Sequence, residues 1–161
     1  MLILGQEHIH HFALLVSPKN PTGNNLSTWR LHAMNRPNPA YATQQEWQYK
    51  PAIVPGRTTR LLALVLLGKT QGSGEDISNI LTAVELVQDD PSWTCKEWVF
   101  GAIELLVTRG IIARPPIELG NLYGFASKLA DSFKERPVER QAYFPVPTCD
   151  NTGTLITSEV I

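Results

Sequence analysis

The sequence predicts an α+β fold, with a mostly antiparallel sheet of about four strands and about three helices packed on it. Apolar, partly alternating segments occupy the first 67 residues, and segments of helical periodicity follow them to about residue 133. Stretches rich in Pro, Gly, Asn and Ser separate the segments. A run of strands followed by a run of helices is typical of helices packed on an antiparallel sheet.

The composition is that of one lightly charged globular domain. The chain has 161 residues, of which 43% are hydrophobic and 18% charged, and its net charge is -1. This charge gives no electrostatic reason to expect nucleic acid as a partner, and no apolar run is long enough to span a membrane. We expect residues 1–135 to form a single domain and residues 136–161, rich in chain breakers, to form a loosely structured C-terminal extension.

The cysteines and the first residues predict a cytoplasmic protein with free thiols. Cys95 and Cys149 are too few for a disulfide framework, and neither has a neighbour at metal-ligand spacing. Residues 1–7 lack the basic leader of a signal peptide. We therefore expect no metal and no cofactor.

The first two expected strands form a hairpin with a long connection. Residues 8–16 alternate and then become continuously apolar, and residues 27–34 alternate throughout. Residues 17–25 between them are dense in turn formers. In this hairpin His11 and His32 lie toward the same open end, where residues on adjacent strands are close neighbours.

The other expected elements follow from the lengths of the apolar segments and from the Gly and Pro residues that separate them. The most apolar segment ends at a glycine and has the length of a buried strand, although its leucines also suit a short helix. The expected elements are strands at residues 46–54 and 60–67, helices at 73–84, 93–109 and 121–133, and a late strand near 154–156.

Cys95 is the main candidate for chemistry. Thr94 and Glu97 have capping-box spacing, while Asp90 and Ser92 are alternative caps. With any of these caps Cys95 lies in the first helical turn, where the helix dipole favours a thiolate.

Two interpretations of this cysteine follow. It is either a small buried hydrophobic residue or a nucleophile, which needs a histidine from elsewhere in the fold. A helix packed on the hairpin can bring Cys95 to His11 and His32. His8 and His10 are expected at the surface, with His10 an alternative partner, and a metal site at His8, His10 and His11 is a further alternative.

The chain resembles an uncharacterised family of small fungal proteins over roughly residues 6–134. The resemblance rests on the shared strand and helix motifs, which are His-x-Ala-Leu-Leu from His11, Trp29-Arg-Leu-His32, the apolar residues 61–69, and Val-Gln-Asp-Asp-Pro-x-Trp-x-Cys-x-x-Trp-Val at residues 87–99.

More distantly, the histidine strand followed by the cysteine helix resembles the permuted papain-like proteins, which include the lecithin retinol acyltransferase-like and NlpC-like enzymes. This resemblance implies a permuted papain-like fold with Cys95 as the nucleophile, His11 as the base and His32 as the residue that orients the base. Those enzymes usually have Asn before the cysteine, where this chain has Thr94.

Together these features lead us to expect a small cysteine-dependent enzyme with a small-molecule or acyl substrate. The reaction would be acyl transfer, hydrolysis, or a secondary-metabolite tailoring step such as cyclisation or isomerisation. The alternative is a non-catalytic module on the same fold that binds a small molecule or a peptide. The expected substrate-binding residues are the four tryptophans, Trp29, Trp47, Trp93 and Trp98.

Overall fold

The computed structural model describes residues 2–6, 9–19, 26–38, 40, 45–56, 60–135 and 145–158. Its helices are α1 (Gly74–Leu81), α2 (Cys95–Thr108) and α3 (Leu119–Lys134). Its strands are β1 (Leu2–Gln6), β2 (Ile9–Val16), β3 (Leu26–Leu31), β4 (Ala33–Pro37), β5 (Gln45–Tyr49), β6 (Ala52–Pro55), β7 (Leu61–Leu66), β8 (Thr148–Asp150) and β9 (Leu155–Ile156).

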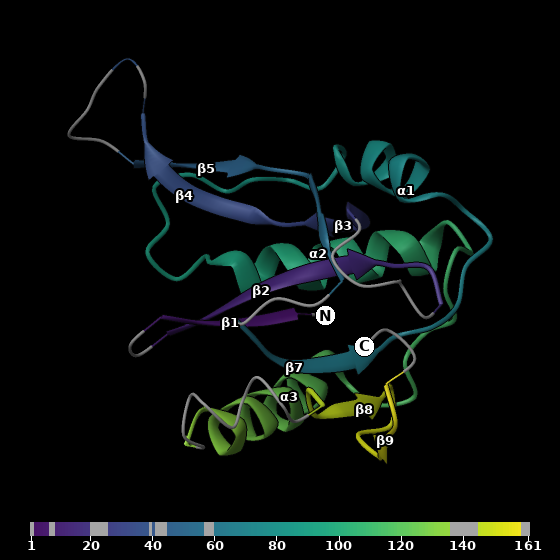
Figure 1. Cartoon of the computed structure of the whole chain (residues 1–161). Coiled ribbons are helices and arrows are strands. Elements are labelled where there is room, and N and C mark those ends of the chain that lie inside the picture. Colours follow the sequence, from purple (N-terminus) through teal and green to yellow (C-terminus); the bar gives the residue numbers. More distant parts are fainter. Residues whose placement is uncertain are drawn as a thin grey trace.

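Among the described residues, the strands form two sheets (Figure 1). The main sheet has seven strands in the order β6-β3-β2-β1-β7-β8-β9, and β4 and β5 form a separate hairpin that extends away from it. Neighbouring strands are antiparallel except for β7 and β8. Because β1 is antiparallel to both β2 and β7, these two strands run in the same direction and end at the same edge of the sheet.

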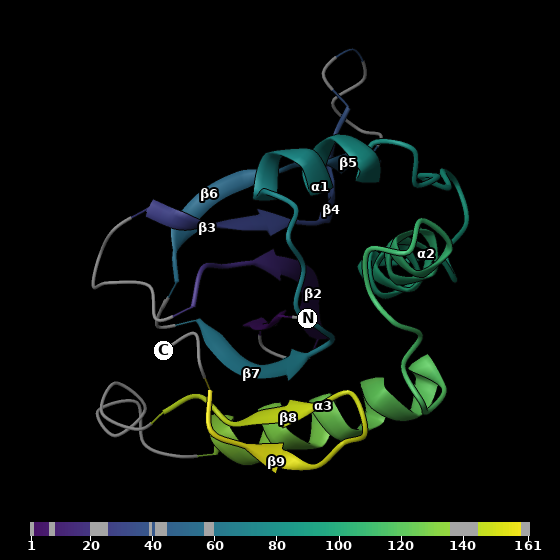
Figure 2. The same cartoon turned by 90° about the vertical axis from the view of Figure 1, so that its right-hand side faces the viewer.

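The helices surround the curled main sheet (Figure 2). Helix α1 lies over β3, α2 lies beside β2, and α3 lies below β7. The largest fully buried side chains include Trp98 and Ile103 of α2, Leu122 of α3 and Leu31 of β3. Within the described part of the chain, no helix has the length and apolarity needed to cross a membrane.

The α+β class and the hairpin are confirmed. Strands β2 and β3 pair antiparallel, with Leu14 opposite Leu31 and Val16 opposite Trp29. The apolar segment expected at residues 60–67 is the strand β7, and five of its six residues are buried. Two-sided burial explains why it shows a continuous apolar run instead of alternation.

The expected number of strands is too small, and two of the expected strands are interrupted. The strand expected at residues 27–34 stops before His32, and the chain then continues as β4 in the separate hairpin. The strand expected at residues 46–54 is split at Lys50 and Pro51 between the two sheets, because proline has no N–H to donate. Strand β1, which was not expected, lies between β2 and β7.

The described part of the C-terminal segment is not loose. Strand β8 pairs with β7, with Cys149 opposite Val65. The side chains of Val146 and Cys149 are buried. A strand of three residues leaves almost no periodic signal in the sequence. The domain boundary expected at residue 135 remains a prediction.

Candidate functional site

Helix α2 begins as the capping-box spacing predicts. The N-cap is Thr94, whose Oγ1 accepts the Lys96 N–H at 3.2 Å, and Glu97 Oε2 accepts the Thr94 N–H at 2.9 Å. Of the alternative caps, Asp90 instead accepts the Ser92 N–H at 2.8 Å in the preceding turn. Cys95 is therefore the first residue of the helix.

The thiol of Cys95 is enclosed by the core. Cys95 is 7% exposed and belongs to the main hydrophobic cluster. The N–H of Phe12 in β2 donates to its Sγ at 3.4 Å. Burial raises the pKa of the thiol, although this hydrogen bond acts in the opposite direction.

His11 and His32 meet, as the hairpin predicts. His11 Nε2 and His32 Nδ1 are 2.5 Å apart, so one ring donates a hydrogen bond to the other. Burial, followed by the charge of Arg30, lowers the pKa of His11 to about 4. Burial and then the neighbouring charges of His11, Arg30 and Arg36 lower the pKa of His32 to about 3. Near neutral pH the rings form an uncharged pair.

The histidine pair and Cys95 lie on opposite faces of β2. Phe12 belongs to the same hydrophobic cluster as Cys95, whereas Ala13 belongs to a second cluster on the other face. Because strand side chains alternate, His11 shares the face of Ala13 and points away from the cysteine. The described residues accordingly show no hydrogen bond between the thiol and either ring of the pair.

His10 and His11 lie on opposite faces of β2. Its Nε2 is 2.7 Å from Asp131 Oδ1 of α3, and its Nδ1 is buried without a hydrogen-bond partner. Because His10 and His11 point to opposite faces, they do not form a common metal site. His8 lies outside the described residues. In the described part of the chain, no three His, Cys, Asp or Glu side chains are placed to hold a metal.

Three of the four tryptophans pack against other aromatic rings. Trp47 and Trp93 form an edge-to-face pair with their centroids 5.0 Å apart. Trp98 is 1% exposed and stacks on Tyr49 at 5.3 Å. Of the expected substrate-binding residues, only Trp29 lines the pocket described next.

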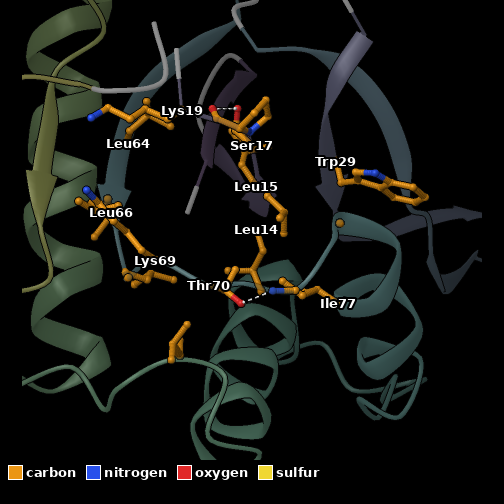
Figure 3. A pocket seen from close by; sticks show the side chains of 18 of the residues that line it. Leu14, Leu15, Ser17, Lys19, Trp29, Leu64, Leu66, Lys69, Thr70 and Ile77 are labelled. Atoms are coloured by element: carbon orange, nitrogen blue, oxygen red, sulfur yellow. Dashed lines mark hydrogen bonds between the residues drawn. The ribbon is translucent and has the colours of Figure 1, made fainter. Parts of the chain in front are cut away.

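A pocket of about 890 Å³ lies at the edge of the sheet where β2 and β7 end. We call it the strand-end pocket. Figure 3 shows Leu14 and Leu15 in its middle, Trp29 on one side, and Leu64 and Leu66 on the opposite side. The other lining residues come from the segments that follow β2 and β7, from α1, from the end of α2 and the loop after it, and from β8 and β9. They include Ser17, Lys19, Lys69, Thr70, Ile77, Leu106, Ile111, Ile112, Thr148 and Ile156.

Gly74, the first residue of α1, allows Trp29 to stand against this helix. A Cβ added to Gly74 would lie 2.0 Å from Trp29 Cδ1, far inside van der Waals contact. Ser73 begins the helix with a capping box to Asp76, so the chain turns into α1 directly beside the indole. The glycine and the cap together fix one wall of the strand-end pocket.

The sequence interpretation missed most of the strand-end pocket and also missed Asp131. The pocket is assembled from strand ends and loops that are distant in the sequence, and no local pattern reports such contacts. One local signal was present, because Gly68, Gly72 and Gly74 surround Lys69 and Thr70 in a loop that directly follows the most apolar strand. Loops at strand ends often carry binding residues.

The fold and the pocket define a class of protein, an α+β domain with a curled, mainly antiparallel sheet and an apolar pocket at one edge. The chain belongs to a family of unknown function (DUF6914), which matches residues 4–121. The matched region contains Cys95, the histidine pair and most of the residues that line the strand-end pocket. No curated protein and no solved structure matches the chain.

Proposed function

We propose that this protein binds a small, largely apolar molecule in the strand-end pocket. The observation that carries this proposal is the size and lining of the pocket, about 890 Å³ enclosed mainly by aliphatic side chains and Trp29. Pockets for small molecules commonly have volumes of about 300–1,000 Å³ and apolar walls with a few polar groups. A binding module is the alternative that the sequence left open beside a cysteine enzyme.

Strands and helices of the fold form the walls of the pocket. This favours a preformed binding site over a gap left by imperfect packing. Leu14 and Val65, which line it, are 4% exposed each and belong to the sheet, and Leu106 belongs to α2. The indole of Trp29 is held by its contact with Gly74. A site formed in advance in this way loses little conformational entropy when a ligand enters.

Binding can be tested with 1-decanol as a neutral apolar probe, measured by isothermal titration calorimetry. We expect one saturable site per chain and a negative heat-capacity change, because apolar surface is buried. Trp29→Leu should weaken binding roughly five- to thirtyfold, since part of a large apolar contact is lost. Trp47→Leu is the matched control, because Trp47 is also half-buried but does not line the pocket. Absence of saturable binding, or equal losses in both variants, would contradict the proposal.

A second candidate function is thiol chemistry at Cys95, with His10 in place of His11 as the base. One specific observation favours it. His10 shares the cysteine face of β2, donates one hydrogen bond from Nε2 to Asp131 Oδ1, and keeps its other ring nitrogen buried and without a partner. This order of groups resembles the base and orienting residue of papain-like enzymes, and the candidate reactions remain acyl transfer, hydrolysis and a tailoring step.

Two variants separate the second candidate from the first. If His10 is the base, His10→Ala should raise the pH at which Cys95 reacts with iodoacetamide, while His11→Ala should leave that pH unchanged. If both variants leave it unchanged, no histidine activates the thiol and the second candidate fails. Binding of 1-decanol should be unaffected by His10→Ala, because His10 does not line the strand-end pocket.

A further inference from the structure

We infer that the ligand of the strand-end pocket is a branched molecule with two apolar arms, which lie on opposite faces of the main sheet. This inference rests on the proposed function and adds the shape of the ligand to it. It comes from the residues that line the pocket, because they belong to two hydrophobic clusters that the sheet separates.

One group of lining residues lies on the face of the sheet that the helices cover. Leu14 of β2, Ile77 of α1 and Leu106 of α2 line the pocket, and all three belong to the main hydrophobic cluster. Trp29 and Ile112 also line the pocket and pack against the same cluster. We call this part of the pocket the helix-side lobe. A strand and two helices fix its walls.

A second group of lining residues lies on the opposite face. Leu64 of β7 lines the pocket but belongs to the smaller hydrophobic cluster, together with Val146. Leu15 of β2 also lines the pocket and packs against this smaller cluster. Because Leu14 and Leu15 are consecutive in a strand, their side chains point to opposite faces of the sheet. We call this part of the pocket the far-side lobe.

The two lobes meet at the ends of β2 and β7. Both strands end at the same edge of the sheet, and the pocket is lined there by residues of both clusters. Figure 3 shows Leu14 and Leu15 in the middle of the pocket, between the side with Trp29 and the side with Leu64. The pocket therefore passes from one face of the sheet to the other around this edge.

A branched ligand matches this shape better than a linear one. A straight alkyl chain in one lobe leaves the apolar wall of the other lobe in contact with water. A linear alcohol that bends around the edge to reach both lobes buries its hydroxyl end in one of them, which costs free energy. Two arms that both end in methyl groups cover both walls, and each further CH₂ group that is buried strengthens binding by about fourfold. The volume of about 890 Å³ leaves room for both arms.

The test compares 5-decanol with 1-decanol, two isomers that have the same atoms and one hydroxyl group each. Isothermal titration calorimetry should show tighter binding of 5-decanol by about fourfold or more, because at least one additional CH₂ group is buried. A preference for 5-decanol smaller than about twofold would overturn this inference and leave the proposed function standing. If neither isomer shows saturable binding, both are wrong.

Filling one lobe at a time assigns the two arms. Leu15→Phe narrows the far-side lobe and Ile112→Phe narrows the helix-side lobe, and both residues are half-buried. Each variant should lose the preference for 5-decanol and keep its affinity for 1-decanol, which needs only one lobe. Leu105→Phe is the matched control, because Leu105 is also half-buried and does not line the pocket.

Circular dichroism checks that each variant is folded. If both filled variants are folded and keep the full preference for 5-decanol, the inference is wrong. If a variant does not fold, the comparison of the two isomers on the unaltered chain decides the inference by itself.

Discussion

The two ends of β2 differ in what their side chains do. At the amino end, His10 contacts Asp131, His11 contacts His32, and the N–H of Phe12 contacts the thiol of Cys95. At the carboxyl end, Leu14 and the residues after it line the strand-end pocket. The reactive side chains at the amino end are engaged by hydrogen bonds to other elements, whereas the carboxyl end borders a pocket. Nucleophilic side chains alone are therefore a poor guide to where the pocket of this protein lies.

The largest expected effect concerns the pocket end. Removing residues 136–161 should destabilise the fold by about 3 kcal/mol or more, because the buried side chains of Val146 and Cys149 and the pairing of β8 with β7 are lost. Urea unfolding followed by circular dichroism measures this change. A truncated chain as stable as the full chain would restore the loose extension that the sequence predicted, and it would show that the C-terminal wall of the pocket is dispensable.

The next effect concerns the amino end and depends on pH. Burial holds the pKa of His11 at about 4 and that of His32 at about 3, against about 6.5 in the unfolded chain. The folded state thus binds fewer protons, so stability is constant above pH 6.5 and falls as the pH decreases toward 4. At pH 5 the loss is about 2 kcal/mol for each ring.

Urea unfolding at pH 7, 6 and 5 measures this loss. Replacing both rings, His11→Gln with His32→Gln, should flatten the pH profile, whatever the variant's stability at pH 7. His10→Gln is the control and should keep a steep profile, because His10 lies outside the pair. An unchanged slope in the double variant would assign the acid sensitivity to other groups.

A smaller effect returns to the pocket end. Gly74→Ala should destabilise the protein by about 1–3 kcal/mol and weaken binding of 1-decanol, because the new methyl group would displace Trp29. Gly120→Ala is the control, since Gly120 is also near the start of a helix and nothing lies within 4 Å of the added Cβ. That variant should be neutral or more stable by up to about 1 kcal/mol. Equal stability and equal 1-decanol binding of the two variants would show that Trp29 can move aside at little cost in free energy.

The smallest effect concerns the thiol. Because burial raises its pKa, Cys95 should react with iodoacetamide only at a pH above the range of an ordinary thiol, with a pKa of about 8.5. Cys149, whose pKa burial also raises, serves as the internal reference. Mass spectrometry of the modified peptides across pH measures both. Selective reaction of Cys95 near neutral pH would revive the cysteine enzyme and reverse the comparison between the two ends of β2.

Local patterns predicted the three helices and most of the strands. The alternation of side chains along β2 decided which candidate residues meet, and the local patterns did not predict this. The capping box of Thr94 and Glu97 placed the cysteine helix to within two residues, and hairpin geometry placed His11 beside His32. The expected meeting of that pair with Cys95 required the helix to cover the face of His11. Residues after His11 are apolar on both faces of the strand, so the sequence does not predict which face the helix covers. The packed core shows that α2 covers the face of Phe12.

The strand-end pocket was less predictable, because it depends on contacts between distant segments. Trp29 was expected to bind substrate, but so were Trp47 and Trp98, which fill the space between elements instead. A tryptophan in a core and one in a pocket wall have the same sequence signature. Because β1 lies between β2 and β7, these two strands end at the same edge of the sheet, where the pocket forms. The five residues of β1 show too little hydrophobic pattern for the sequence to predict this strand.

The pairing of β7 with β8 also has a consequence for biosynthesis. More than 80 residues separate the two strands, so during translation the ribosome finishes α1, α2 and α3 before it adds the partner of β7. Until then this strand presents unpaired N–H and C=O groups along an apolar edge, which is a template for association with other nascent chains. Slow synthesis or early termination after α3 should therefore favour aggregation, and a ligand that already occupies the neighbouring space should oppose it.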